Sequence, residues 1–342
     1  MRILIVSQMW PGPRDPDLGA FVEQVARELG RLGHEVDRAV IDHRGGSKAK
    51  YLGLLARARS ARPADVVFAH FLVPAGLIGL LAARGPLVVM AHGQDVANAE
   101  RSRALRGLTK LTVRNARAVI ANSEHLAARL ERATGVRADA VIDCGVDLER
   151  FAPGVEPAPW PVAESGPSGM GGPRFLCVGS LVERKNVVAL ADAFASLGTG
   201  SLVFVGDGPL RGVLESRGGD RIHVAGRVPH AEVPRWIAAC NVLCQPSLVE
   251  PFGQAALEAM AMERSVVGTR VGGAAELVPL EAGVLVDPAD VAAIADGLRA
   301  AAALPFPNEA AREAARLHDV RVQAQRMAEL LERAADRGGG RR

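Results

Sequence analysis

Two glutamates stand eight residues apart in the segment Glu250–Glu258, which reads Glu-Pro-Phe-Gly-Gln-Ala-Ala-Leu-Glu. The segment follows an apolar run at 242–244 and opens a predicted helix. The amides of Phe252 and Gly253 are unpaired donors at the positive end of the helix dipole, so they suit an anion such as a diphosphate. We expect Glu258 to accept hydrogen bonds from a vicinal diol such as a ribose, and Glu250 to face the ligand from before the helix.

Further motifs follow predicted strands along the chain. They read His92-Gly-Gln-Asp95, Gly179-Ser-Leu-Val-Glu-Arg-Lys185-Asn186, Gly206-Asp-Gly-Pro209, Gly226-Arg-Val228 and Gly272-Gly-Ala-Ala-Glu276, and Gly19-Ala-Phe21 comes after a Pro-rich loop near the start. With the Glu250–Glu258 segment, they resemble the retaining glycosyltransferases of family 4 (glycosyl transferases group 1), which have the GT-B architecture. The resemblance is specific because six of these motifs agree in order and spacing, and the opening with Gly19 is also similar.

The resemblance implies a donor site in the second half of the chain. Lys185 would neutralise the diphosphate leaving group of a nucleotide sugar, and Glu250 would hold the sugar. Val228 would offer its backbone to the nucleotide base, so no side chain reveals which base is bound. Many family members have an arginine where this chain has Ser180. A hydroxyl cannot replace a guanidinium clamp, so one phosphate contact is either absent or supplied by Arg184.

The resemblance also implies roles for three residues of the first half. His92 would reach the donor sugar close to the reacting carbon. Asp95, three residues further on, is then either an acceptor-side residue or a helix cap. Gly19 resembles the glycine whose amide meets the diphosphate from the first domain.

The fold prediction follows from a repeated unit of a short apolar run, a turn and an amphipathic helix. Runs of this length, nearly continuous in Val, Ile, Leu and Ala, are typical of strands covered on both faces of a parallel sheet. The predicted strands are Ile3–Val6, Val36–Ile41, Val66–Ala69, Leu87–Ala91, Ala118–Asn122, Ala140–Asp143, Phe175–Val178, Leu202–Val205, Ile222–Ala225, Val242–Cys244, Ser265–Gly268 and Val284–Val286. We therefore expect an α/β protein of two doubly wound, Rossmann-like domains that face each other across a cleft.

Composition shifts predict the domain boundaries. Residues 1–160 form the acceptor-side domain, the Pro- and Gly-rich residues 161–173 a linker, and residues 174–310 the nucleotide-sugar-binding domain. A helical segment at 311–336, broken near His318, is expected to return to the first domain. The tail at 337–342 is expected to be disordered.

Charge and cysteine content suggest where the protein works. The net charge of +3 is too small to predict nucleic-acid binding. Two runs, Arg44–Arg62 and Arg101–Arg117, each hold six basic residues and no acidic one. They fit either solvated helix faces or attraction to an anionic membrane surface. No transmembrane segment or signal peptide is predicted, and the four cysteines fit a reducing cytoplasm, so we expect a cytoplasmic protein with possible attachment to the inner membrane face.

These patterns predict a retaining hexosyltransferase-type enzyme that moves a sugar from a UDP- or GDP-sugar to a glycan, lipid-linked or small-molecule acceptor, for example in polysaccharide biosynthesis. No cofactor or metal is expected, since Asp15 and Asp17 form the one Asp-x-Asp pair and fit a solvated loop. A nucleotide-sugar epimerase of the same architecture is one alternative, and a two-domain sugar-binding protein is another. A nicotinamide dehydrogenase is disfavoured because no GxGxxG follows the first strand.

Overall fold

The computed structural model describes residues 1–162, 172–217 and 219–336. The chain divides into two compact units. Unit 1 holds Met1–Gly145 together with the C-terminal segment that starts at Val320, and unit 2 holds Val146–Asp319. The predicted linker at 161–173 falls largely on residues 163–171, and the predicted tail on 337–342. Both stretches lie outside the described residues.

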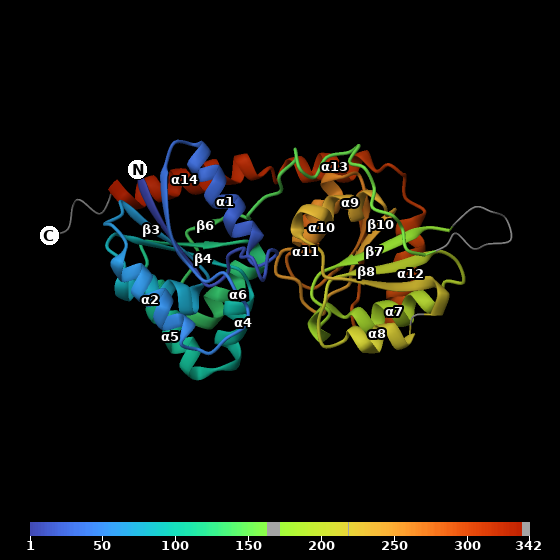
Figure 1. The fold of residues 1–342 in the computed structure, drawn as a ribbon, viewed down its shortest axis with the longest axis horizontal. Coiled ribbons are helices and arrows are strands. Elements are labelled where there is room, and N and C mark those ends of the chain that lie inside the picture. The colour runs from blue at the N-terminus through green and yellow to red at the C-terminus, as the bar shows by residue number, and fades with distance from the viewer. Residues whose placement is uncertain (163–171, 218, 337–342) are drawn as a thin grey trace. The chain divides into compact units, whose positions relative to one another are not determined.

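Unit 1 is a parallel sheet with helices on both faces (Figure 1). In the part of the chain that the structure describes, its strand order is β2-β1-β3-β4-β5-β6. The strands are β1 (Arg2–Ser7), β2 (Glu35–Val40), β3 (Val66–His70), β4 (Leu87–Ala91), β5 (Ala118–Ala121) and β6 (Ala140–Val141). The helices are α1 (Ala20–Arg31), α2 (Lys50–Ser60), α3 (Leu77–Ala82), α4 (Gln94–Arg101), α5 (Arg103–Asn115), α6 (Glu124–Thr134) and α14 (Val320–Asp336).

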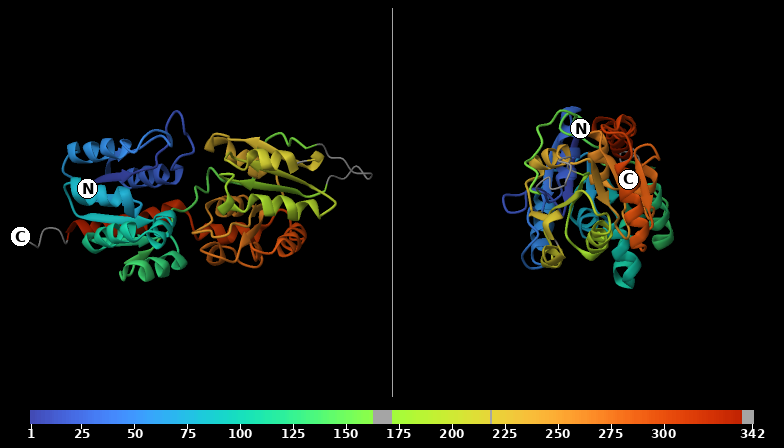
Figure 2. Two further views of the ribbon diagram at one scale, coloured as in Figure 1. Left: turned by 90° about the horizontal axis from the view of Figure 1, so that it is seen from below. Right: turned by 90° about the vertical axis from the view of Figure 1, so that its right-hand side faces the viewer.

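Unit 2 repeats this architecture with a different strand order, β12-β11-β10-β7-β8-β9 among the described residues (Figures 1 and 2). Its strands are β7 (Arg174–Val178), β8 (Ser201–Val205), β9 (Ile222–Gly226), β10 (Val242–Gln245), β11 (Ser265–Thr269) and β12 (Gly283–Val286). Its helices are α7 (Val187–Ala195), α8 (Arg211–Arg217), α9 (Val233–Ala238), α10 (Gln254–Ala261), α11 (Ala274–Leu277), α12 (Val291–Ala302) and α13 (Glu309–Arg316).

The strand orders tell where ligands can bind. In an open parallel sheet, a crevice forms outside the carboxyl ends of the strands at the point where the order reverses. This point lies between β1 and β3 in unit 1, and between β7 and β10 in unit 2. The loops that follow these strands therefore carry the candidate site residues of each unit.

The predicted α/β class with two doubly wound parallel sheets is confirmed. Each predicted strand is present, with ends that differ by at most two residues. The predicted break near His318 separates α13 from α14, and α14 returns to unit 1, where it packs on α1.

The unit boundaries differ from the predicted ones. The chain passes to unit 2 at Val146 rather than after residue 160, and it leaves at Asp319 rather than at 310. The reason is packing, because Val146 and Phe151 are buried in the same core cluster as Ala311 of α13. The amide of Val146 also donates to the carbonyl of His318 at 2.8 Å, which holds the two crossing points together.

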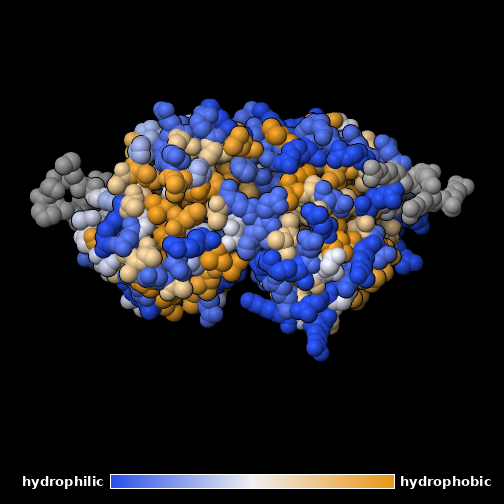
Figure 3. Space-filling model, turned by 180° about the vertical axis from the view of Figure 1, so that it is seen from behind, coloured by the Kyte–Doolittle hydropathy of each residue, from blue (hydrophilic) through white to orange (hydrophobic). Residues whose placement is uncertain are grey.

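Apolar side chains fill both faces of each sheet. In unit 1, one cluster joins the sheet to α1 and α14, and another joins it to α2, α3 and α6. The four cysteines are free and buried, and burial raises the pKa of Cys177 and of Cys240 to about 12. On the face in Figure 3, hydrophobic residues lie among hydrophilic ones, as is usual for globular proteins.

Asn308 provides a test of how α13 is held in unit 2. Its side chain is buried, accepts from the amide of Ala311 at 3.1 Å, and donates to Ser265 Oγ and to the carbonyl of Glu281, both at 2.9 Å. Asn308→Ala removes the helix cap and leaves buried partners unpaired, so it should lower the free energy of unfolding by about 2–3 kcal/mol. Chemical denaturation followed by fluorescence measures this change.

The matched control is Asp290→Ala, which removes the exposed cap of α12. It should cost about 1 kcal/mol, because water replaces the lost hydrogen bonds. Equal losses in the two variants would contradict the role given to the buried contacts of Asn308.

Candidate functional site

Lys185 and Glu250 form an ion pair at the carboxyl edge of the sheet in unit 2. Lys185 Nζ lies 2.6 Å from Glu250 Oε2, and both side chains are largely buried. Lys185 follows β7 and Glu250 follows β10, the two strands at the reversal point of the sheet. The ammonium therefore stands where a parallel sheet binds its ligand, with a carboxylate as its present counterion.

Two neighbouring features hold Lys185 in this place. Asn186 has a left-handed backbone with φ of 56°, and its side-chain amide donates to the carbonyls of Pro246 and Pro288 at 3.1 and 2.7 Å. These bonds tie the turn of Lys185 to the loops after β10 and β12. Gly206 packs directly on the turn after β7, where a Cβ would lie 1.8 Å from the carbonyl oxygen of Gly179. The glycine motif after β8 thus serves close backbone packing.

Glu250 is held by its backbone as well as its side chain. Ser247 Oγ donates to Glu250 Oε2 at 3.0 Å. The Glu250 carbonyl accepts from the Gly273 amide at 2.8 Å, and its amide donates to the carbonyl of Val271 at 3.1 Å. A Cβ on Gly272 would lie 2.1 Å from the Glu250 carbonyl oxygen, so only glycine fits there. The motif at 272–276 therefore positions Glu250.

The start of α10 lies next to this ion pair in the chain. Gly253 caps the helix with φ of 109° and no side-chain cap. Within the described residues, the amides of Phe252 and Gly253 donate no hydrogen bond to the protein. These donors suit an anion, as the sequence predicts.

Glu258 lies in α10 and is buried. Glu258 Oε1 is 3.4 Å from His230 Nε2, and the His230 ring lies 5.9 Å from that of Phe151. His230 follows β9, two residues after Val228, which is half-buried. The structure thus groups Glu258 with the segment predicted to meet the nucleotide base.

Ser180 lies in the turn after β7 and is exposed. Its carbonyl accepts from the amide of Val182 at 3.0 Å. The Arg184 carbonyl accepts from the Leu248 amide at 3.0 Å, so the backbone of this turn contacts the loop before Glu250.

In unit 1, Asp95 shapes the loop that carries His92. Its carboxylate accepts from the amides of Leu72, His92, Gly93 and Val96 at 3.0, 3.2, 2.9 and 3.0 Å. Burial raises the pKa of Asp95, and these amides oppose that rise. The carboxylate is thus engaged with backbone amides around His92 and at Leu72, and the N-cap residue of α4 is Gly93 rather than Asp95.

His92 lies among aromatic rings. It is half-buried, with the rings of Phe21 and Phe71 at 5.0 and 4.6 Å. Gly19 caps the helix that carries Phe21, with φ of 67°, and a Cβ there would lie 2.5 Å from the carbonyl oxygen of Met9. The structure therefore brings the Gly19 helix end close to His92.

His70, at the end of β3, contacts His92 directly, with 3.1 Å between His70 Nδ1 and His92 Nε2. Burial lowers the pKa of His70 to about 3. Burial, and then the nearby His70, lower the pKa of His92 well below its usual value. Both rings are therefore neutral near pH 7.

The Asp-x-Asp pair is engaged in ion pairs. Arg44 Nη1 lies 2.9 Å from Asp15 Oδ1, and Arg44 Nη2 lies 2.7 Å from Asp17 Oδ2. Throughout residues 1–162, 172–217 and 219–336, no group of three or more His, Cys, Asp or Glu side chains is arranged to hold a metal ion.

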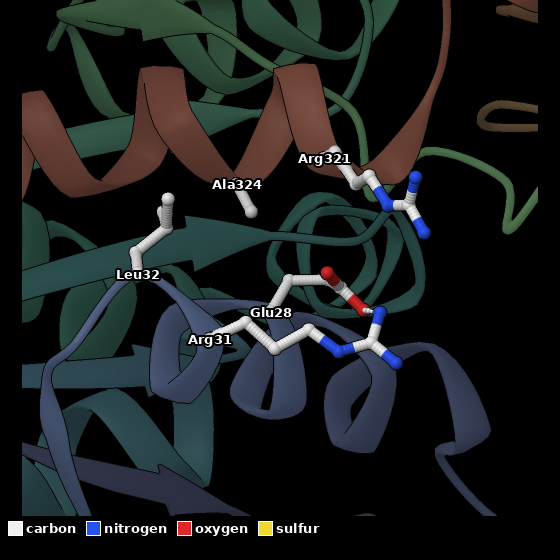
Figure 4. A pocket seen from close by; sticks show the side chains of 5 residues that line it. All are labelled: Glu28, Arg31, Leu32, Arg321 and Ala324. Atoms are coloured by element: carbon white, nitrogen blue, oxygen red, sulfur yellow. Dashed lines mark hydrogen bonds and ion pairs between the residues drawn. The ribbon is translucent and has the colours of Figure 1, made fainter.

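A separate pocket of about 290 Å³ lies between α1 and α14 in unit 1 (Figure 4). Its lining residues are Glu28, Arg31, Leu32, Arg321 and Ala324. Arg31 Nη1 lies 2.8 Å from Glu28 Oε1. None of the predicted site residues lines this pocket.

Sequence reasoning missed four residues that contact or position the predicted ones. Each lies at the carboxyl end of a strand or in the turn beyond it. Polar residues at such positions are the sequence signal that could have identified them. They are His70, Asn186, His230 and Ser247.

Comparison with known families matches both halves of the chain. Residues 172–303 match the model described as Glycosyl transferases group 1, and residues 38–150 match Glycosyltransferase Family 4. A putative teichuronic acid biosynthesis glycosyltransferase of Bacillus subtilis is 30% identical over 244 residues. The match covers 68% of this chain and 60% of that relative's own length.

Solved structures share the whole fold. A sucrose-phosphate synthase from Thermosynechococcus elongatus is 22% identical, with a TM-score of 0.79 and coverage of 97% of this chain and 98% of the other. HepE of Anabaena in complex with UDP-glucose is 23% identical, with a TM-score of 0.75 and coverage of 97% and 99%. The two family models and the shared fold place the chain in the family 4 glycosyltransferases with the GT-B architecture.

Proposed function

We propose that this protein is a retaining glycosyltransferase that moves a sugar from a UDP- or GDP-sugar to an acceptor. The observation that carries the proposal is the placement of Lys185, whose ammonium lies at the reversal point of the sheet. The free amides at the start of α10 lie in the loop after β10, directly after Glu250, the ion-pair partner of Lys185. A diphosphate leaving group needs this combination of charge and hydrogen-bond donors.

Each part of the donor is assigned to one group of unit 2. The diphosphate binds Lys185 and the amides of Phe252 and Gly253, and the ribose binds Glu258. The sugar contacts Glu250, which Ser247 keeps in place when the ammonium turns to the diphosphate. Val228 offers its backbone to the base. The complex of HepE with UDP-glucose favours uridine among the candidate bases.

The chemistry follows from where charge develops. As the bond from the anomeric carbon to the diphosphate breaks, negative charge grows on the leaving oxygens and positive charge grows on the sugar. Once the donor is bound, Lys185 and the helix amides already face the leaving oxygens, so they stabilise the first charge without further reorganisation during the reaction. We propose that no metal ion is needed, that a leaving phosphate oxygen takes the acceptor proton, and that His92 of unit 1 contacts the transferred sugar.

Lys185→Ala should lower kcat for sugar transfer at least about 100-fold, because the leaving group loses its main positive charge. The assay incubates UDP- and GDP-sugars with candidate acceptors in EDTA and follows products by NMR, which also reports the anomeric configuration. Arg217→Ala is the control, since this exposed side chain pairs with Asp192. Near-normal transfer by Lys185→Ala, or conversion of the donor sugar without an acceptor, as an epimerase would give, would contradict the proposal.

Glu258→Ala should weaken binding of UDP or GDP roughly tenfold or more, because the ribose hydroxyls lose a charged acceptor. Isothermal titration calorimetry measures this affinity. Glu281→Ala changes an exposed glutamate of the same unit and should leave the affinity unchanged. Unaltered affinity in Glu258→Ala would remove Glu258 from the ribose site.

We further propose that unit 1 attaches to an anionic membrane surface and that the acceptor is lipid-linked or a cell-surface glycan precursor. Within the described residues, no helix is long and apolar enough to cross a bilayer. However, α5 carries the second basic run and exposes Leu108 and Leu111 by 39% and 46%. Helix α3 packs on α5, and α2 packs on α3. Leu52 of α2 and Leu81 of α3 are also exposed. Exposed leucines beside basic residues suit the interface of an anionic bilayer.

A Leu108→Ser, Leu111→Ser double variant should lose most binding to vesicles that contain phosphatidylglycerol, and binding of the unaltered protein should fall as salt rises. Leu280→Ser is the control, because this exposed leucine lies in unit 2. Sedimentation with vesicles measures the bound fraction. Binding that ignores both salt and the double substitution would contradict membrane attachment through α5.

A further inference from the structure

The contact between two neutral histidines leaves one buried ring nitrogen without a partner. His70 is fully buried, and within the described residues its Nε2 has no hydrogen-bond partner. Its other nitrogen, Nδ1, lies 3.1 Å from His92 Nε2. His92 is only half-buried, and no hydrogen bond of its Nδ1 to a described residue is present.

Only one proton can lie between the two rings, so two arrangements are possible. If His92 Nε2 donates to His70, the proton of His70 must sit on Nε2, where it is buried and unpaired. If His70 Nδ1 donates to His92, the buried Nε2 keeps a lone pair, and the second proton of the pair sits on His92 Nδ1. Buried N–H groups without a partner are rarer than unsatisfied acceptors, so the second arrangement is favoured.

We infer that His70 is a positioning residue that donates from Nδ1 to His92 Nε2 and thereby fixes His92 as the tautomer with a proton on Nδ1. His92 then presents an N–H donor at its accessible edge, and its only lone pair is occupied by His70. It is thus unsuited to act as a general base. It suits a neutral hydrogen-bond acceptor, which a hydroxyl oxygen of a sugar provides.

The surroundings support this assignment. The ring of Phe68 lies 4.5 Å from that of His70, and Phe71 and Phe21 flank His92. These three phenylalanine rings offer no competing hydrogen-bond partner to either histidine. The lowered pKa values of both histidines agree with a neutral pair.

The link to a sugar rests on the proposed function, whereas the tautomer itself is measured on the protein alone. NMR of the ¹⁵N-histidine-labelled full chain distinguishes protonated from lone-pair ring nitrogens, and the His92 signals are identified by their loss in His92→Gln. We expect Nδ1 of His92 to be protonated and Nε2 to carry the lone pair. A proton on His92 Nε2 in the unaltered protein overturns the inference.

Two variants separate the hydrogen bond from packing. His70→Asn keeps an N–H donor close to the position of Nδ1 but loses the ring, whereas His70→Phe keeps the ring but loses the donor. We expect the tautomer to persist in His70→Asn, and His92 to shift toward protonation on Nε2 in His70→Phe. The kcat/KM for the nucleotide-sugar substrate should fall at least about tenfold in His70→Phe and at most about threefold in His70→Asn.

Thermal unfolding of each variant checks that packing is retained. The opposite result would show that His70 acts through packing and would overturn the inference. In that case His70→Phe would keep the His92 tautomer and the transfer rate, and His70→Asn would lose them. If His70→Asn does not fold, the His92 tautomer in the unaltered protein and in His70→Phe still tests the inference. If Nδ1 of His92 is protonated but the protein transfers no sugar, the tautomer assignment holds and the proposed function is contradicted.

Discussion

The largely buried ammonium of Lys185 is the constraint on which the candidate donor site depends. A buried charge is strongly destabilising without a partner, and Glu250 supplies one at 2.6 Å. A bound diphosphate would bring a stronger counterion to the same ammonium. Glu250 would keep its hydrogen bond from Ser247, so the carboxylate remains in place for the sugar. One ion pair can thus both neutralise Lys185 and prepare the site for the donor.

Backbone packing makes this placement possible. The glycines after β8 and β11 let two loops approach the segments that carry Lys185 and Glu250 more closely than any side chain would allow. Asn186 then joins the Lys185 turn to two further loops through carbonyl groups. The glycine motifs therefore do not all contact a ligand. At Gly206 and Gly272 they position the residues predicted to do so.

The strands and helices could be predicted because burial on both faces of a parallel sheet leaves a plain sequence signal. The boundary between the two units near Gly145 could not be predicted, because the segment after it has no periodic pattern. Phe151 joins unit 2 only through tertiary packing. The sequence motifs also predicted that Lys185 and Glu250 belong to the donor site. The contact of Asp95 with the Leu72 amide and the contact between His70 and His92 join residues distant in sequence, and a single sequence does not report them.

The two units thus divide the proposed chemistry, with charge for the diphosphate in unit 2 and a neutral histidine pair in unit 1. We propose that Lys185 and the first amides of α10 bind the diphosphate, and a crystal structure of the protein with bound UDP or GDP would test this binding mode. We expect diphosphate oxygens within hydrogen-bond distance of Lys185 Nζ and the Gly253 amide, with the ribose at Glu258. A diphosphate bound elsewhere, with Lys185 still paired only to Glu250, would contradict it.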